Sequence, residues 1–213
     1  MKRLLKIFAS SVLAGIFIGL GATVFCLVST TSGKVIASFL FGLGLFSVIQ
    51  FKLYLYTGKI GFVLDNKISY LLDLLICFIG NMIGAIFIAL IFKLTRSADS
   101  LKLAATTIVN NKINDSWYSI LLLSIGCGMM IYLAVKGHAY TDNMFGKVLF
   151  CFLPVMVFIL CNFEHVIANA SYFTYAGVFN LKTVFYFSLM LLGNSIGSII
   201  LDLLFKASTF KEQ

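Results

Sequence analysis

The sequence predicts an all-α integral membrane protein built as a helical bundle. Hydrophobic residues make up 61% of the chain and charged residues only 11%, whereas soluble domains are about 45 to 50% apolar. The mean hydropathy is +1.03, and several apolar runs exceed the roughly 20 residues that cross the hydrocarbon core as a helix. A transmembrane barrel would need strict alternation of apolar and polar residues, which is absent. We therefore expect helices that span a bilayer.

The first three of six expected spans lie before residue 93. Span one runs from about 7 to 29 and carries small residues that permit close helix approach. Its apolar run is too long for a signal peptide and lacks a cleavage pattern, so we expect a retained helix. Span two begins near Val35, and polar residues and glycines interrupt it between Gln50 and Gly61. Unwound backbone at depth is tolerated only where protein or water satisfies it, so span two is predicted to be a broken helix. Span three runs from about 68 to 92.

The second half of the chain follows a polar segment that we interpret as a loop. Span five is interrupted, as span two is, and Asn162 to His165 mark the interruption. We expect a short polar tail at the end. In order, the elements are the polar loop 93–115, span four at about 117–135, a polar loop at 136–147, span five at about 148–178, span six at about 183–205 and the tail 206–213.

A repeated motif indicates duplication. Gly80-Asn81-x-x-Gly84 recurs as Gly193-Asn194-x-x-Gly197, an offset of 113 residues that also carries Gly15 onto Gly128. With three spans per repeat the two halves face opposite ways. We therefore predict an inverted 3+3 repeat, about 7–92 and about 116–205, within a single membrane domain covering 1–213. Such folds place the permeation site at mid-depth, where the two broken helices meet.

His165 is the expected centre of function. An ionisable residue at bilayer depth costs roughly 2.5 to 3.5 kcal/mol on insertion scales, so it usually faces a partner or a water-filled path. The structural alternative is that His165 only bonds Glu164 or Asn169 within the bundle. We expect Glu164 to have a structural role, fixing the interruption or pairing with a lysine. Lys52 and Lys59 either bias the pore toward anions or merely snorkel or pair with Glu164.

Composition also limits cofactors, partners and orientation. All five cysteines fall inside predicted spans without metal-ligand spacing, so we interpret them as packing residues and expect no metal and no cofactor. The net charge of +8 is scattered among loops, which favours lipid headgroups or anions as partners and not nucleic acid. Lysines and arginines outside the spans favour cytoplasmic termini. Eight lie on the side of the termini (Lys2, Arg3, Lys6, Lys67, Lys136, Lys147, Lys206, Lys211) and six on the other (Lys34, Lys93, Arg96, Lys102, Lys112, Lys182).

Across nearly all of its residues the chain resembles the formate/nitrite transporter family. The motifs that carry the resemblance stand in the family's order and spacing. They are Phe163-Glu164-His165-x-x-Ala168-Asn169, Leu55-Tyr56-Thr57-Gly58, the two Gly-Asn-x-x-Gly motifs, and Ala14-Gly15-x-x-Ile18.

The resemblance implies a homopentamer of aquaporin-like protomers in a bacterial cytoplasmic membrane. Each protomer would have its own pore for a small monovalent anion or its neutral acid, as a channel or a proton-coupled transporter. His165 matches the central pore histidine and Thr57 the threonine opposite it, and Asn169 belongs to the same motif. The implied outer constriction is Phe41, Leu45 and Phe158, the inner one is Leu55, Tyr56 and Ile131, and the vestibule lysines are Lys6 and Lys112.

The chain departs from the family's pattern near both interruptions. Tyr54 stands where the family usually has Glu, Lys59 where it has Asn, and Lys52 where it has a small residue. The other departures are Asn162 in place of Gly, Ala170 in place of Met, and Gly128 after Cys127 where the family often has Asn. Substrate choice and gating are the properties that these changes affect.

Formate or nitrite is the expected cargo, and the chemistry explains the need for a polar centre. Stripping water from a unit charge is costly unless a counter-charge or proton replaces it. Histidine has an ordinary pKa near 6.5, so His165 is suited to stabilise an anion or hand it a proton, and the Thr57 hydroxyl to hold the imidazole or the anion. Alternatives are hydrosulfide or a short carboxylate such as acetate or lactate. A membrane-embedded enzyme using Glu164 and His165 is a competing class, but no metal-ligand set, nucleophile motif or nucleotide loop accompanies them.

Overall fold

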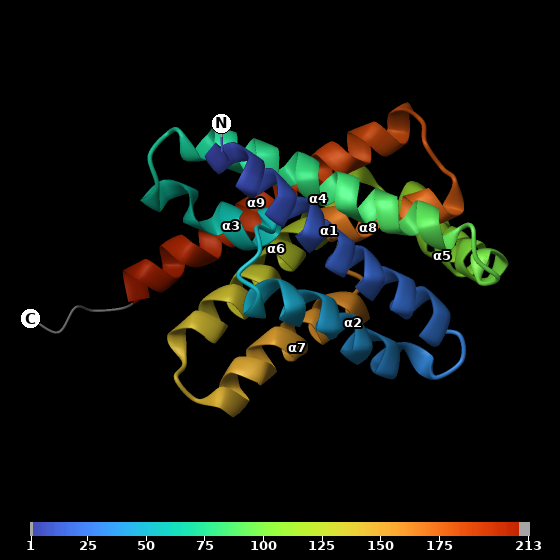
Figure 1. Cartoon of the computed structure of the whole chain (residues 1–213), viewed down its shortest axis with the longest axis horizontal. Coiled ribbons are helices and arrows are strands. Elements are labelled where there is room, and N and C mark those ends of the chain that lie inside the picture. The colour runs from blue at the N-terminus through green and yellow to red at the C-terminus, as the bar shows by residue number, and fades with distance from the viewer. Residues whose placement is uncertain (1, 209–213) are drawn as a thin grey trace, which may run out of the picture.

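The protein is all-helical over the residues that the structure, a computed structural model, describes, 2–208. Five of its helices, α1, α2, α4, α6 and α9, are long and apolar enough to cross a membrane, and α7 is a shorter apolar helix. Figure 1 shows the helices crossing in one bundle, with the 3₁₀ segment η1 following α3. The elements are α1 (Lys2–Val28), α2 (Gly33–Gln50), α3 (Tyr56–Lys59), η1 (Ile60–Asp65), α4 (Tyr70–Phe92), α5 (Ala98–Ile113), α6 (Trp117–Tyr140), α7 (Met144–Leu160), α8 (Val166–Ala176) and α9 (Leu181–Ser208).

Glycines bring two pairs of helices into close contact. A Cβ atom added to Gly15 on α1 would lie 2.2 Å from the backbone oxygen of Asn81 on α4. A Cβ added to Gly128 on α6 would lie 2.2 Å from the backbone oxygen of Asn194 on α9. The prediction that small residues permit close approach is therefore confirmed for α1. A side chain at Gly128 would collide with this backbone.

Two segments of the chain leave the helical conformation within the bundle. Residues 51–55 separate α2 from α3, and residues 161–165 separate α7 from α8. Each contains one non-glycine residue with a left-handed backbone, Lys52 and Asn162, both at φ 54°. Asparagine tolerates this conformation better than lysine does. The chain is thus non-helical at the places where the sequence shows polar interruptions.

The polar segment 93–115 differs from the prediction, because most of it forms a helix, α5. Leu101, Ala104, Ala105 and Val109 are buried and recur at helical spacing, so one face of α5 packs on the bundle. Two of these four residues are alanines and the opposite face is polar, which kept the average hydropathy of the segment low. The second predicted loop, 136–147, is also shorter than expected, since α6 continues to Tyr140 and α7 begins at Met144. In the tail, α9 continues to Ser208, and residues 209–213 lie outside the described part.

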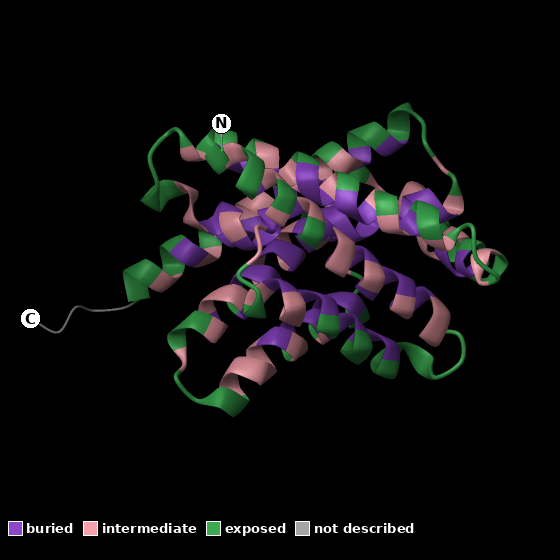
Figure 2. Ribbon diagram, viewed as in Figure 1, coloured by how far each residue is buried: buried purple, intermediate pink, exposed green. Residues whose placement is uncertain are grey.

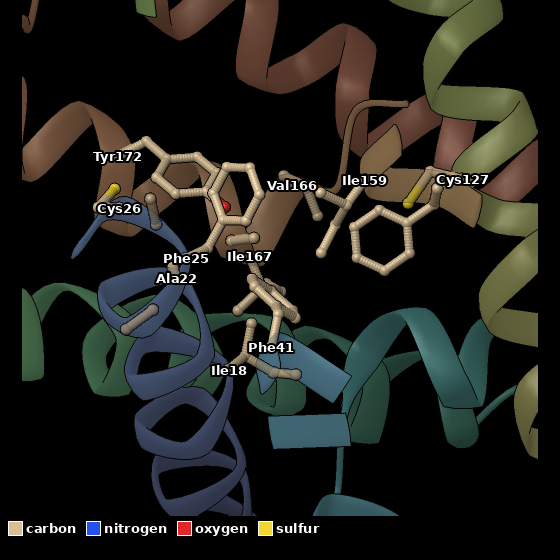
Figure 3. Close-up of a cluster of buried hydrophobic side chains, with 14 of the residues drawn as sticks. Ile18, Ala22, Phe25, Cys26, Phe41, Cys127, Ile159, Val166, Ile167 and Tyr172 are labelled. Carbon is tan, nitrogen blue, oxygen red and sulfur yellow. The ribbon is translucent and has the colours of Figure 1, made fainter. Parts of the chain in front are cut away.

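The core consists of one large apolar cluster and a smaller one that contains Tyr56, Ile60, Leu74 and Cys77. Figure 2 shows buried residues concentrated where the helices cross, with exposed residues on the outer faces and loops. In the close-up of Figure 3, Phe25 on α1 lies beside Tyr172 on α8, and their ring centroids are 6.4 Å apart. Phe41 on α2 lies near Ile18 in the same view. The helix α8 is thereby enclosed, and ten of its eleven residues are buried.

Candidate functional site: a buried histidine between two non-helical segments

His165 is the residue immediately before α8, and it is 2% exposed. Its Nδ1 accepts a hydrogen bond from the backbone N–H of Ala168 at 3.1 Å. Its Nε2 lies 3.0 Å from the hydroxyl oxygen of Thr57 on α3. The ring of Phe158 stacks on the imidazole with centroids 5.7 Å apart. His165 therefore bonds Thr57 and the Ala168 backbone, and the two bonds and the stacked ring fix the orientation of the imidazole.

Two buried asparagines hold the backbone of the non-helical segments. On α4, Asn81 donates through its amide nitrogen to the carbonyls of Ser11 and Tyr54 and accepts from the N–H of Tyr56 at 2.7 Å. This satisfies backbone groups that have no helical partner where α3 begins. Because Thr57 follows Tyr56 directly, Asn81 also fixes the position of the threonine hydroxyl.

The same arrangement recurs on the other side of the bundle. Asn194 on α9 donates to the carbonyls of Ser124 and Glu164 and accepts from the N–H of Val166 at 3.0 Å. Asn81 and Asn194 are 113 residues apart, as the sequence motif requires, while the groups they hold around Tyr56 and Val166 are 110 apart. The second asparagine thus bonds the backbone on both sides of His165, and the first bonds the backbone just before Thr57.

A cavity of about 750 Å³ reaches this histidine from the side of α5. Its wall combines apolar rings with charged and amide side chains. The residues that line it are Phe25, Ser29, Thr30, Lys34, Leu103, Ala104, Thr107, Ile108, Asn111, Lys112, Asp115, Leu123, Phe158, Ile159, Asn162, Phe163, Glu164, His165, Ala168, Asn169 and Tyr172.

Beside His165, an ion pair and an amide form a buried polar cluster. Lys112 on α5 binds the Glu164 carboxylate at 2.5 Å, and their side chains are 11% and 3% exposed. The amide nitrogen of Asn169 donates to the same carboxylate oxygen at 2.7 Å. The amide oxygen of Asn169 is buried and has no hydrogen-bond partner within the described residues.

Of the residues expected at the outer constriction, Phe158 lines the cavity and stacks on the imidazole. Phe41 and Phe158 meet edge to face, with centroids 5.8 Å apart, and Leu45 is buried in the same cluster. Leu55, Tyr56 and Ile131, expected at the inner constriction, are buried as well, with exposed fractions of 2%, 9% and 1%.

The other lysines singled out in the sequence are Lys6, Lys52 and Lys59. None of them is among the residues that bond or stack on the imidazole. Lys6 is exposed and lines a second, more open cavity of about 540 Å³ with Lys2, Arg3 and Tyr54. The ammonium of Lys59 lies 5.1 Å from the centre of the Tyr54 ring, and Lys52 is exposed. The Glu164 carboxylate pairs with Lys112, a lysine partner of the kind expected from the sequence, and it also accepts a hydrogen bond from Asn169 on α8.

Sequence reasoning missed what the buried asparagines and Ser195 do. Asn81 and Asn194 were noticed only as part of a repeated motif, although a buried amide in an apolar helix needs partners and two interrupted segments supply them. Ser195, whose hydroxyl lies 2.9 Å from that of Tyr56, was not singled out. The feature of the sequence that pointed to Ser195 was its position beside Asn194 in the repeated motif.

Comparison with known proteins identifies the family. The sequence model described as "Formate/nitrite transporter" matches residues 1–207. The chain belongs to the formate/nitrite transporter family. It is a multi-pass membrane protein, as the apolar helices indicate.

Relatives within the formate/nitrite transporter family match it at moderate identity. The uncharacterized transporter YrhG of Bacillus subtilis is 33% identical over 95 residues, which are 43% of this chain and 35% of that protein. The formate channel BtFdhC of Bacillus thuringiensis is 33% identical over 93 residues, covering 42% of this chain and 35% of the relative. The formate channel FocA of Haemophilus influenzae is 26% identical over 192 residues, covering 79% and 65%. In each case the match spans less than two thirds of the relative's length.

Solved structures share the fold of the whole chain. A pentameric formate channel with formate bound is similar at a TM-score of 0.77 and 23% identity, covering 97% of this chain and 95% of that one. An FNT family ion channel is similar at a TM-score of 0.80 and 21% identity, covering 97% and 91%. The helical arrangement is therefore that of these channels.

Proposed function

We propose that the chain forms a homopentameric channel for small monovalent anions, formate first and nitrite second, with His165 at the centre of each pore. The observation that carries the proposal is the buried contact between His165 and Thr57, 3.0 Å, at the junction of two non-helical segments and at the end of a large cavity. Family membership and the named formate channels among its relatives support the substrate class. The pentameric neighbour supports the assembly.

The two halves of the chain are, in this proposal, an inverted repeat with a broken helix in each. The paired asparagine networks of Asn81 and Asn194 support it, as do the glycine contacts of Gly15 and Gly128. Irregular backbone inside a membrane needs internal partners, and each asparagine supplies three. The duplication then brings one polar side chain from each half, Thr57 and His165, to the same point.

The hydrogen bonds of His165 favour a neutral imidazole with its hydrogen on Nε2. Nδ1 accepts from the Ala168 N–H and so carries a lone pair, which leaves Nε2 to donate toward Thr57. A doubly protonated ring would lose the Ala168 bond and bury a charge. With its oxygen accepting from the imidazole, the Thr57 hydroxyl keeps its own hydrogen for a passing ion. The Thr57 O–H, oriented by the imidazole, is thus the donor that replaces water at the centre of the pathway.

Lys112 draws anions into the cavity while Glu164 keeps the lysine from holding them too tightly. The ammonium is 2.5 Å from the carboxylate, so the pair is close to neutral as a unit. A cargo that crosses the apolar rings together with a proton, as a neutral acid, avoids the cost of carrying a bare charge through them.

In the cell we place the chain in a bacterial cytoplasmic membrane with both termini in the cytoplasm.

The buried ion pair accounts for Glu164 as a charge partner, so the acid and the histidine do not form a catalytic pair. The family consists of channels and transporters, which agrees with transport and not enzymatic catalysis. Hydrosulfide, acetate and lactate are the competing substrates, and their flux is to be compared with that of formate.

The experiment is flux in liposomes that hold the purified protein. We expect formate and nitrite to cross, with flux rising as the pH falls, because more of the permeant carries a proton. His165→Ala should lower the flux and alter its pH profile, and Thr57→Val should lower it while keeping the shape of the side chain. The matched control is His138→Ala, since this other histidine of the chain lies on α6 and contacts Gln50 at 3.3 Å.

The outcomes separate the parts of the proposal. Wild-type flux and pH profile in His165→Ala would remove the histidine from the mechanism. Faster passage of hydrosulfide, acetate or lactate than of formate would replace the cargo while keeping the channel. The mass of the assembly in detergent, expected at five times the 23.5 kDa protomer, tests the pentamer.

A further inference from the structure

Tyr172 differs from the other buried tyrosines of the chain, because its hydroxyl has no protein partner. A buried tyrosine hydroxyl usually finds a hydrogen-bond partner. The other four buried tyrosines within residues 2–208 each have one: Tyr56 contacts Ser195, Tyr132 donates to Asp202, Tyr175 contacts Thr23, and Tyr186 donates to the carbonyl of Asp115. Tyr172 is 7% exposed, and its hydroxyl makes no hydrogen bond to the described residues. The partner that this group lacks must come from the space beside it.

The space beside the Tyr172 hydroxyl is the cavity that reaches His165, because Tyr172 is one of the residues that line it. The tyrosine oxygen keeps some accessible surface. Among the described residues, the fully enclosed side-chain polar atoms without a partner are Asp73 Oδ1 and Asn169 Oδ1, and the tyrosine oxygen is not one of them. Figure 3 shows the Tyr172 ring beside Phe25, which lines the same cavity. A molecule in the cavity can therefore accept the hydrogen of this hydroxyl.

Tyr172 lies along the route from the cavity mouth to His165. His165, Asn169 and Tyr172 are four and three residues apart, a spacing that places them on one face of α8, and all three line the cavity. Seven residues of helix extend roughly 10 Å along the axis. On α1, Phe25 packs on Tyr172, and Ser29, one turn further toward the mouth, also lines the cavity. An ion that enters at the α1–α2 connection therefore passes Tyr172 before it reaches His165.

The hydrogen of the Tyr172 hydroxyl is available to an ion, whereas two other donors of the cavity wall are engaged. Lys112 is paired with the Glu164 carboxylate. The Thr107 hydroxyl donates to the carbonyl of Leu103 at 3.2 Å. A hydroxyl forms a stronger hydrogen bond with an ionised oxygen than with a neutral one, and a low local dielectric strengthens it further. The group therefore suits a small oxyanion such as a carboxylate or nitrite.

We propose that the Tyr172 hydroxyl forms a binding subsite for a small oxyanion, which it holds in the cavity before the ion reaches His165. The inference rests on the proposed function and adds a substrate-binding residue to it. One oxygen of formate or nitrite accepts the tyrosine hydrogen, and this bond replaces one of the water contacts that the ion loses on leaving bulk solution. The ion then continues along the same face of α8 to Thr57 and His165. Tyr172 thereby sets the concentration at which the cavity fills.

The test replaces this hydroxyl by hydrogen, with the same replacement one helical turn away as the control. Formate flux into liposomes is measured against formate concentration for the wild type, Tyr172→Phe and Tyr175→Phe. Tyr172→Phe should raise the concentration that gives half-maximal flux roughly two- to tenfold, the range that one net hydrogen bond sets in an equilibrium, and should change the maximal flux less. Tyr175→Phe should leave the half-saturating concentration unchanged, because the Tyr175 hydroxyl bonds Thr23 at 2.7 Å and the residue does not line the cavity.

Thermal unfolding in detergent provides a readout that does not depend on transport. Without formate, Tyr172→Phe should unfold at the wild-type temperature, because its hydroxyl has no protein partner to lose, whereas Tyr175→Phe should unfold at a lower temperature. A ligand that binds the folded protein raises the unfolding temperature. Replacing chloride by formate at constant ionic strength should therefore stabilise the wild type and Tyr175→Phe, and should stabilise Tyr172→Phe less.

The results that would overturn the inference differ from the one that would overturn the function. An unchanged half-saturating concentration in Tyr172→Phe, with wild-type stabilisation by formate, would mean that the hydroxyl bonds only water, while the channel function stands. A Tyr172→Phe variant that fails to fold, or that loses as much stability as Tyr175→Phe, would mean that the hydroxyl has a protein partner. A wild-type protein that passes no anion would instead refute the proposed function, and the stabilisation by formate in the wild type and Tyr172→Phe would then decide whether the subsite exists.

Discussion

At the scale of single residues, the cluster of Lys112, Glu164 and Asn169 is the part of the site whose burial costs the most free energy. Two opposite charges are nearly buried at 2.5 Å, and each is stabilised mainly by the other. Exposed ion pairs contribute little to stability, but removing one partner of a buried pair leaves an uncompensated charge. The lysine is therefore expected to matter for folding as well as for anion attraction.

Replacing Lys112 tests this directly. Lys112→Met should lower the free energy of unfolding by about 3 kcal/mol, because it leaves the Glu164 carboxylate buried without a counter-charge. Lys112→Met combined with Glu164→Gln should recover much of that loss, and thermal unfolding in detergent measures both. Lys34→Met is the matched control, since Lys34 lines the same cavity but is exposed. A single variant as stable as the double would show that the pair contributes nothing.

At the scale of elements, the two asparagines replace the helical hydrogen bonds that the non-helical segments lack. Asn194→Ala should destabilise the protein by roughly 3 kcal/mol or more, since each buried backbone group left without a partner costs about 1 to 3 kcal/mol. It should also lower formate flux, because the start of α8 positions His165. Thermal unfolding and liposome flux provide the two readouts.

Asn66→Ala is the control for that change. The Asn66 amide bonds the carbonyl of Phe62 but is exposed, so its loss should change stability by less than about 0.5 kcal/mol. Equal stability of Asn194→Ala and Asn66→Ala would contradict the role given to the buried asparagine. The same comparison can be made with Asn81→Ala in the first half of the chain.

Much of this arrangement could be predicted from the sequence, because bilayer physics leaves few choices for apolar runs. The spans, the positions of the polar interruptions and the equivalence of Gly15 with Gly128 all come from length, polarity and spacing. The helix α5 was missed because its buried face uses two alanines, which hydropathy averages hide. Motif spacing also showed that Asn81 and Asn194 correspond, although it did not reveal that each bonds three backbone groups.

The sequence alone could not predict that Lys112 pairs with Glu164, for a related reason. Its members lie 52 residues apart on α5 and beside α8, and the periodicity of one helix does not determine which partner packs against it. Resemblance placed Lys112 near the vestibule, but only the packing of α5 on α8 brings it to the carboxylate. The Tyr56–Ser195 contact has the same origin, since it joins α3 to α9 across the fold.

At the scale of the whole molecule, the cavity beside His165 and the chain termini lie toward opposite ends. In Figure 1 the end of α9 lies at the left and α5 at the right. Residues of the α1–α2 connection and of α5 line the cavity, so it opens at the end away from the termini. With cytoplasmic termini, this cavity faces the outside.

Cysteine labelling in intact cells can establish the orientation. Cys161 is the exposed cysteine among the five and is first changed to serine, while the other four are buried. Thr30→Cys, at the cavity mouth, should then react with a membrane-impermeant maleimide added outside, and Ser208→Cys only after the cells are opened. Labelling of Ser208→Cys in intact cells, with Thr30→Cys protected, would reverse the orientation. That result would make the Lys112 cavity the cytoplasmic entrance, so the same protein would collect its anions from inside the cell.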